Sequence, residues 1–270
     1  KKYEDENQFN EDMFLVMKDE KREITLLALG DGVSTAKLGS GKEASSILRK
    51  NIIEAFKEKA SLLKDEISIK EFCSKVIAKS NIDIIESIKT KVDITKETPS
   101  GIMATTLILA VIVRNKMYYT SIWDSRLFIY SEKDGLNLLN YEDNVMNLKL
   151  ANGMAWDKVV NSEGRYAITR YIGGGSFKDG NLYPREFTIS IHCLDLEPGQ
   201  IIIICSDGVT DYINKSYYND DLWKVTESLE KIIKENKEKS LDVLNNKIIT
   251  EANLNGGGDN ITIITSKVLK

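Results

Sequence analysis

Acidic residues border the short apolar runs of this chain in a recurring way. Asp31 follows the run TLLALG, Asp207 follows IIIICS, and Asp259-Asn260 precedes ITIITS. The pair Glu11-Asp12 precedes MFLVM, and Asp124 follows YYTSIW. Aspartate is a common turn residue, so an ordinary strand-end turn explains any one of these positions. The whole set indicates a shared site, because buried strands end together at the edges of sheets.

Carboxylates gathered at adjoining strand ends form a hard oxygen-donor site of the kind that Mg²⁺ or Mn²⁺ prefers. Zinc fits less well, because His192 is the only histidine and no Cys/His cluster occurs. Glycine follows both Asp31 and Asp207. A glycine there permits a tight backbone path and the close approach of a carbonyl group to an ion. The residues therefore predict a magnesium or manganese site.

The three cysteines, Cys73, Cys193 and Cys205, are widely spaced. An odd count with such spacing argues against a disulfide framework and favours a reducing compartment, so we expect a cytoplasmic protein. All three lie among apolar neighbours and are predicted to be core residues. A cysteine-phosphatase loop needs arginine six residues after the cysteine, and none of the three has one.

Other nucleophile or nucleotide motifs fit poorly. The stretch Gly39 to Lys42 suggests a phosphate-binding loop, but that motif needs a glycine at Ala36 and Ser or Thr at Glu43. His192 lies in the alternating run FTISIHC, where a hydrogen-bonded sheet histidine is a better interpretation than a general base.

Length and charge set further limits. The 270 residues are predicted to form a single domain, 1–270. The net charge is -4 and no basic stripe occurs, which makes nucleic acid a poor partner. The most apolar run, Ile102 to Val113, is shorter than the roughly 20 residues that span a bilayer, so no membrane segment is expected. We also expect no signal peptide and a monomer.

Short apolar runs predict strands, and 3.6-residue periodicity predicts helices. The predicted strands are Met13–Met17, Ile24–Leu29, Thr105–Val113, Met117–Ile122, Leu127–Tyr130, Leu136–Leu139, Phe187–His192, Gln200–Cys205 and Ile261–Val268. The predicted helices are Glu43–Ala60, Ile69–Ile88, Asp220–Asn236 and Leu241–Leu254. Strand clusters between helix pairs predict an α+β fold, a four-layer αββα sandwich of two antiparallel sheets. No clear period exists over Tyr141 to Arg165.

The acidic positions belong to an ordered series of short motifs. The series comprises NED at Asn10 to Asp12, DG at Asp31-Gly32 followed by GKEAS at Gly41 to Ser45, TT at Thr105-Thr106 with DSR at Asp124 to Arg126, SDGVTD at Ser206 to Asp211, and GDN at Gly258 to Asn260. TRYIG at Thr169 to Gly173 is a further match. This series resembles that of the type 2C metal-dependent protein serine/threonine phosphatases, especially their compact bacterial form. The matches span nearly the whole chain.

The resemblance implies a site and its ligands. By the match, Asp31 would bridge two metal ions, and the Gly32 carbonyl would bind one of them. Asp207 and Asp259 would bind the other, so that the three aspartates form the catalytic centre. The positions implied to hold metal-bound waters or a third, weaker ion are Glu11, Asp12, Asp124 and Asp211. Thr105, Thr106 and Arg126 would be structural, with the arginine paired to a buried acid.

The resemblance also implies a phosphorylated protein as substrate. Two cations about 3.5–4 Å apart lower the pKa of a bridging water, and the resulting metal-bridged hydroxide would attack phosphorus in line. No covalent enzyme intermediate is needed, which agrees with the missing nucleophile motifs.

Three positions depart from the family pattern. Asn7 stands where the family has an arginine that grips the substrate phosphate, so either another cation such as Lys2 or Arg22 substitutes or phosphate binding is weak. Trp123 replaces the glycine before DSR, which would reshape the floor of the third-metal site. Val33 replaces a histidine that donates a proton in many eukaryotic members, so water would protonate the leaving group.

These departures motivate an alternative, a catalytically weak phosphatase-like domain that binds a phosphoprotein or acts as a regulatory module. The retained aspartates argue against it, because buried acids without a metal repel one another. The segment Tyr141 to Arg165 is interpreted as a variable flap that selects substrates.

Overall fold

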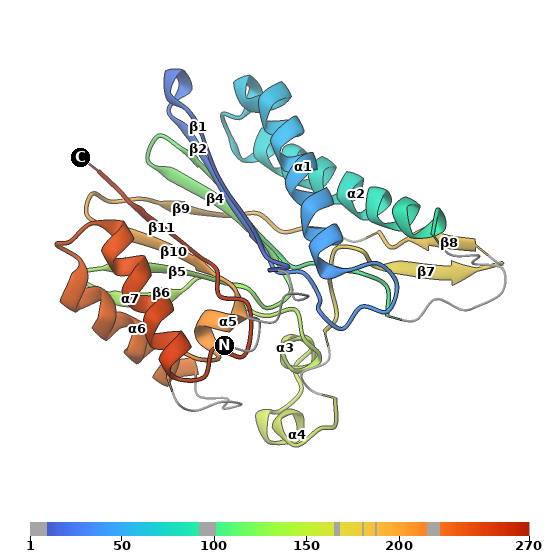
Figure 1. The fold of residues 1–270 in the computed structure, drawn as a ribbon. Coiled ribbons are helices and arrows are strands. Elements are labelled where there is room, and N and C mark those ends of the chain that lie inside the picture. The colour runs from blue at the N-terminus through green and yellow to red at the C-terminus, as the bar shows by residue number, and fades with distance from the viewer. Residues whose placement is uncertain are drawn as a thin grey trace.

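A computed structural model describes residues 10–91, 101–164, 168–179, 181–186, 188–214 and 222–269. Its centre is a pair of antiparallel sheets (Figure 1). The first sheet has the order β1-β2-β3-β4-β9, formed by Met13–Asp19, Ile24–Gly30, Leu107–Val113, Lys116–Ile122 and His192–Asp195. The second has the order β11-β10-β5-β6, formed by Ile263–Lys267, Ile201–Cys205, Arg126–Ser131 and Gly135–Leu138.

A helix pair covers the outer face of each sheet (Figure 1). The first pair is α1 (Gly41–Lys59) and α2 (Glu66–Lys89), and the second is α6 (Leu222–Asn236) and α7 (Leu241–Leu254). Both helices of the first pair begin at a capping side chain. Ser40 accepts from the Glu43 amide and Asp65 accepts from the Ser68 amide, which satisfies donors that a helix start leaves free.

Three apolar layers hold the sandwich together, and alternation along the strands explains them. On β2, Leu26 and Ala28 pack toward the first helix pair, whereas Leu27 and Leu29 pack toward the second sheet. On β10, Ile202 and Ile204 fill the space between the sheets, and the neighbouring isoleucines pack against the second helix pair. Strands buried on both faces read as continuous apolar runs for this reason. The predicted four-layer αββα sandwich is confirmed.

Two local predictions were wrong. The strand predicted over Phe187–His192 is β9, which begins only at His192, where it pairs with Tyr119 of β4; Phe187 itself lies outside the described residues. Cys193, predicted to be core, is exposed because β9 is the edge strand of its sheet. Cys73 and Cys205 are buried as predicted.

The structure also contains elements that the sequence pattern missed. The hairpin of β7 (Gly175–Lys178) and β8 (Asn181–Pro184) lies beside α2 (Figure 1). Between β6 and β7, the segment without clear periodicity contains two short helices, α3 (Val145–Ala151) and α4 (Trp156–Val160). None of the described helices is both long and apolar enough to cross a bilayer.

Candidate metal centre

The acidic residues collect at one edge of the sandwich, where strands of both sheets end. Asp31 follows β2 of the first sheet, and Asp207 follows β10 of the second and starts the short helix α5 (Asp207–Thr210). Asp124 lies in the connection from β4 to β5, which crosses between the sheets. Asp12 and Asp259 lie just before the first and last strands. Each chain segment contributes an acid because it enters or leaves a sheet at this edge.

The carboxylates of Asp31 and Asp12 are strongly perturbed. Burial raises the pKa of Asp31 well above its ordinary value, and the charges of Asp207, Asp12 and Asp124 add to that rise. Burial likewise raises the pKa of Asp12 to about 6, with a further contribution from Asp207. The Asp12 carboxylate lies near the side chains of Thr262 and Ser206, yet neither of its oxygens makes a well-aligned hydrogen bond with a described residue.

Three further aspartates share the same field. Burial raises the pKa of Asp207, and the charge of Asp259 raises it further. Burial and the charge of Asp207 raise the pKa of Asp211 to about 7. Burial raises the pKa of Asp124 well above its ordinary range, followed by the charges of Asp207 and Glu142. Like charges that lie close together in a poorly solvated place disfavour the ionised form of each carboxyl group. A positive charge among them would stabilise the ionised carboxylates.

The cluster fits a divalent cation in its donor chemistry. Both oxygens of Asp12 and the Oδ1 atom of Asp207 are buried without a hydrogen-bond partner among the described residues. Buried carboxylate oxygens of this kind are costly unless a cation or a donor satisfies them. Asp31, Asp124 and Asp207 are each partly exposed, so an ion from solution can reach them.

The side chains nevertheless stop short of a closed ligand cage. Within the described part of the chain, no three acidic, cysteine or histidine side chains already surround a common point suited to an ion. The acids lie close enough to raise one another's pKa, but their side chains do not converge on one point.

Two glycines bring the motif segments into backbone contact. A Cβ on Gly32 would lie 2.3 Å from the carbonyl oxygen of Gly41, at the start of α1. A Cβ on Gly208 would lie 2.0 Å from the carbonyl oxygen of Asn260. The expected tight backbone path after Asp31 and Asp207 is therefore confirmed: the first path packs against the start of α1, and the second packs against the segment of Asp259 and Asn260.

Thr106 fixes the backbone of Asp31. The Asp31 amide donates to Thr106 Oγ1 at 2.8 Å, and the Thr106 amide donates to the Asp31 carbonyl at 2.8 Å. The Thr106 hydroxyl also contacts Ser125 Oγ at 2.7 Å, beside Asp124. Thr105 forms backbone hydrogen bonds in both directions with Ile172. The structural role expected for the two threonines is confirmed.

Thr106→Val is predicted to lower the free energy of unfolding by about 2 kcal/mol, because it leaves the Asp31 amide without its acceptor in a buried place. Urea unfolding measures this, and calorimetry with Mn²⁺ should show weaker metal binding. Thr25→Val is the matched control, since Thr25 is half-buried on β2, and its effect should stay within about 0.5 kcal/mol. Equal effects of the two substitutions would contradict the role given to Thr106.

Glu11 occupies a different setting from the other predicted acids. Its carboxylate accepts a hydrogen bond from the Lys42 amide at 3.2 Å, in the first turn of α1. Its own amide donates to Asn260 Oδ1 at 2.8 Å. Glu11 thus joins the start of the chain to α1 and to the segment before β11.

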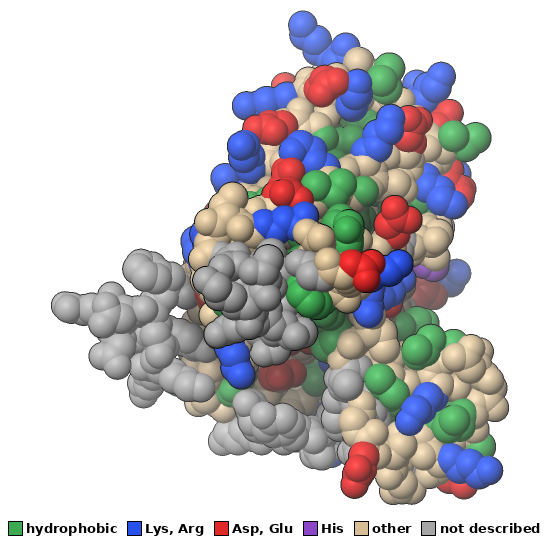
Figure 2. Space-filling view, turned by 90° about the vertical axis from the view of Figure 1, so that its right-hand side faces the viewer, with side chains coloured by type: hydrophobic (Ala, Val, Ile, Leu, Met, Phe, Trp, Pro, Cys, Tyr) green, Lys and Arg blue, Asp and Glu red, His purple; other side chains and the backbone are tan. Residues whose placement is uncertain are grey.

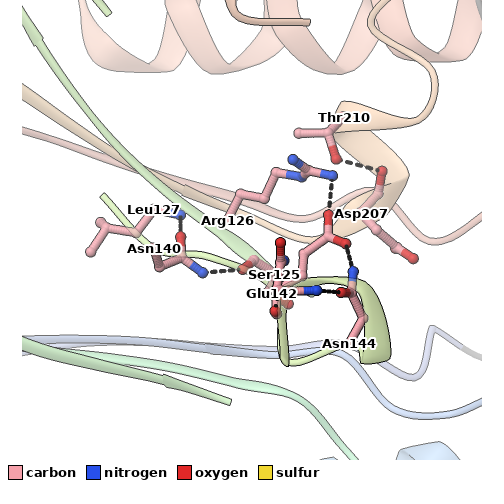
Figure 3. A network of polar contacts seen from close by, with 9 residues as sticks. Ser125, Arg126, Leu127, Asn140, Glu142, Asn144, Asp207 and Thr210 are labelled. Carbon is pink, nitrogen blue, oxygen red and sulfur yellow. Dashed lines mark hydrogen bonds and ion pairs between the residues drawn. The ribbon is translucent and has the colours of Figure 1, made fainter. Parts of the chain in front are cut away.

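Arg126 pairs with an acid that the sequence pattern did not single out. Its guanidinium forms an ion pair with Glu142, whose second oxygen accepts from Asn144 at 2.9 Å (Figure 3). Figure 3 shows the guanidinium beside Asp207, and its charge lowers the pKa of that aspartate against the larger effect of burial. The expected pairing of Arg126 with an acid is confirmed, but that acid is partly exposed rather than buried. Glu142 was missed because it lies where the sequence has no clear period.

Asp143, the next residue, ties the same segment to Trp123. Its carboxylate accepts from the Trp123 amide at 3.0 Å and pairs with Arg170 at 3.5 Å. Trp123 has a φ of 80°, in the left-handed region that a bulky residue rarely adopts. A glycine would adopt this backbone conformation without strain, and the tryptophan adopts it too. The Trp123 ring packs against Tyr171.

The remaining sequence interpretations concern the cations that could replace the phosphate-gripping arginine, and His192. Arg22 cannot substitute for a phosphate-gripping arginine, because the whole of β2 lies between it and Asp31. The seven residues of β2 span about 23 Å. The Arg22 side chain also pairs with Asp19. Lys2 and Asn7 lie outside the described residues. His192 stacks on Tyr119 at 5.2 Å on the exposed edge strand, which places it apart from the acids.

Comparisons with known proteins agree with this geometry. The family model for protein phosphatase 2C matches residues 1–246. A serine/threonine phosphatase stp of Listeria innocua is 24% identical over 246 residues, which cover 91% of this chain and 84% of that protein. A putative protein phosphatase 2C-type of Streptococcus pyogenes is 27% identical over 255 residues, covering 94% and 90%.

Solved structures show the same fold. A serine/threonine phosphatase of S. agalactiae superposes with a TM-score of 0.72 at 22% identity, covering 98% of this chain and 95% of that one. The catalytic domain of the phosphatase PstP in complex with 2 manganese ions gives a TM-score of 0.67 at 18% identity, covering 97% and 93%.

Proposed function

Because the chain belongs to the protein phosphatase 2C family, we propose that it hydrolyses phosphoserine and phosphothreonine in proteins with the help of two Mn²⁺ or Mg²⁺ ions. The observation that carries this proposal is the set of buried carboxylate oxygens without partners, on Asp12 and Asp207. In this proposal residues 1–270 form one catalytic domain, which acts as a monomer in the cytoplasm.

The proposed ligands are those that the resemblance to the family implies. Asp31 would bridge the two ions with help from the Gly32 carbonyl, and Asp207 and Asp259 would hold the second ion. Glu11 and Asp12 would orient water on the ions, and Asp124 and Asp211 would hold a third, weaker ion. The mutual charge effects that connect Asp31 with Asp12 and Asp124, and Asp207 with Asp259, support this grouping.

Bound divalent ions supply charge stabilisation for the phosphoryl group and lower the pKa of water. The chain supplies the positioning. Thr106 holds the Asp31 backbone, and the contact of Gly208 with Asn260 keeps the Asp207 and Asp259 segments together. Arg126 places a positive charge beside Asp207, which favours its ionised form for binding a cation.

Hydrolysis of a phosphothreonine peptide in Mn²⁺ and in EDTA tests the proposal. We expect turnover that requires the metal, with much slower release of phosphate from a phosphotyrosine peptide of the same sequence. Metal binding by calorimetry without turnover of any phosphopeptide would instead support the binding or regulatory module.

The flap over Tyr141 to Arg165 is proposed to contact the phosphoprotein. Large apolar side chains are exposed on it, including Leu148, Met154 and Trp156. Exposed apolar groups beside an active site are suited to hold a protein substrate. Exchange of this segment for that of a relative should change the ranking of phosphopeptides by kcat/KM, and an unchanged ranking would refute the role.

The acid cluster predicts an unusual pH dependence of stability without metal. Asp12 and Asp211 have folded pKa values of about 6 and about 7, against 3.8 ordinarily. Between about pH 4 and pH 7 the folded state therefore holds protons that the unfolded state has released, so the free energy of unfolding falls as the pH rises. Divalent cations should offset this loss. The rise in Tm on adding Mn²⁺ to EDTA-treated protein should grow from about pH 5.5 to about pH 7.5. An equal rise at both pH values would contradict this account.

A further inference from the structure

A cleft lies on the outer side of the first helix pair, between α2 and the residues that follow β8. Its volume is about 340 Å³, at the lower end of the range for small-molecule sites. Lys70, Ser74, Ala78 and Asn81 line it from one stripe of α2. Figure 2 looks onto the face of the molecule that carries these elements, where charged side chains of both signs alternate with exposed apolar ones.

The lining of this α2 cleft combines an apolar floor with positive charge. The floor includes Ile77 and Ile189, which are almost fully buried, and Ile82, which is 46% exposed. Lys70 and Arg185 contribute two positive charges, against one negative charge from Glu186. Within the described residues neither Lys70 nor Arg185 forms an ion pair. Both residues are also exposed, so their charged groups can face a ligand in the cleft.

Asn81 connects the cleft to the segment that supports the acid cluster. Its amide donates to the carbonyls of Gly174 and Arg185 at 3.2 and 2.8 Å, and its Oδ1 accepts from the Gly173 amide at 2.8 Å. The residue before Gly173 is Ile172, which forms two backbone hydrogen bonds with Thr105. Thr105 pairs with Gly32 in an antiparallel bridge. Hydrogen bonds and neighbouring residues of the chain thus connect the wall of the cleft with the backbone beside Asp31.

We propose that the α2 cleft binds a small organic anion with an apolar body of one or two rings, and that the bound anion strengthens metal binding at the acid cluster. The rings would lie on the isoleucine floor, and the anionic group would face Lys70 and Arg185. A ligand that bridges α2 and Arg185 orders the support of Thr105 and Asp31, so the metal site loses less conformational freedom when it binds an ion. The effect on metal binding, the second half of this proposal, rests on the proposed metal site. The anion site itself, the first half, does not.

The probe for the proposed anion site is naphthalene-1-sulfonate, a two-ring aryl sulfonate, titrated by fluorescence and calorimetry. We expect one bound molecule per chain. Ala78→Trp fills the cleft from an exposed position on α2 and should weaken binding by about tenfold or more. Lys70→Ala with Arg185→Ala should also weaken it, since the charge partners are lost. Lys75→Trp, on the same helix but outside the lining, is the control and should leave the affinity unchanged.

Binding that is unaffected by Ala78→Trp, in variants whose circular dichroism is native, would overturn the site. For the second half, Mn²⁺ affinity is measured by calorimetry with and without the probe. Linkage requires that Mn²⁺ raise the affinity for the probe by the same factor as the probe raises that for Mn²⁺. A constant Mn²⁺ affinity would overturn the connection to the acid cluster. Neither measurement uses a phosphorylated substrate, so a failure of the proposed phosphatase activity would be seen separately.

Discussion

Asp207→Asn is expected to reduce metal-dependent phosphatase turnover by about a thousandfold or more and, at the same time, to stabilise the protein in EDTA. The loss follows from the removal of a carboxylate ligand, because charge stabilisation by metal ions contributes several kcal/mol to such reactions. The gain follows from the removal of a buried charge whose Oδ1 atom has no partner among the described residues. An asparagine amide would also offer a donor to the neighbouring carboxylates.

The two effects have opposite signs, which makes the experiment decisive. The kcat for a phosphothreonine peptide and the Tm in EDTA and in Mn²⁺ are the measurements. In EDTA the Tm should rise by a few degrees, at roughly 2–4 °C per kcal/mol for a chain of this size, and the further rise on adding Mn²⁺ should shrink. Asp134→Asn, at an exposed turn between β5 and β6, is the control. A fall of the Tm in EDTA would show that Asp207 stabilises the fold directly and would refute the electrostatic account.

Gly208→Ala is expected to destabilise the protein by about 3 kcal/mol and to abolish turnover. The new Cβ would lie 2.0 Å from the carbonyl oxygen of Asn260, and a backbone atom cannot rotate away as a side chain can. The segments that carry Asp207 and Asp259 would have to separate. Both proposed ligands of one ion would therefore move.

Urea unfolding measures the change in stability, and calorimetry with Mn²⁺ measures the effect on the site. Gly174→Ala is the matched control, since a Cβ there would meet its nearest neighbour at 3.4 Å, an ordinary contact. Its effect should stay within about 1 kcal/mol. If both substitutions behaved alike, the close approach of the two acidic segments would not be a requirement of the fold.

The layered architecture could be predicted because the relevant signals are local. Strands such as β2 and β10 are continuous apolar runs, and the helix pairs carry clear periodicity and capping residues. The family resemblance, carried by short motifs in a fixed order, is confirmed as well. The clustering of Asp12, Asp31 and Asp207 followed from their positions at strand ends, and the structure places them within reach of one another's charge.

Features that depend on tertiary contacts could not be read from the chain. No sequence pattern points to Glu142, and its place near the acids is recognised from its ion pair with Arg126 at the edge of the sandwich. The hairpin of β7 and β8 is short, and its position follows from packing against α2 rather than from strand periodicity. The backbone conformation of Trp123 is opposite to what its residue type favours, and the hydrogen bond from its amide to Asp143 accompanies that conformation.

The contact between Glu11 and Asn260 spans 249 positions of the chain. Proteins are synthesised from the amino terminus, and domains generally fold as units. A nascent chain can already contain Asp12, Asp31, Asp124 and Asp207 while the segment with Asp259 and Asn260 has not yet been added. Until that segment arrives, the Glu11 amide lacks its acceptor on Asn260, and β10 lacks its neighbour β11. The hydrogen bond from Glu11 to Asn260 can form only after that late segment has been synthesised, so the contact between the two ends of this series of motifs is a late event in folding.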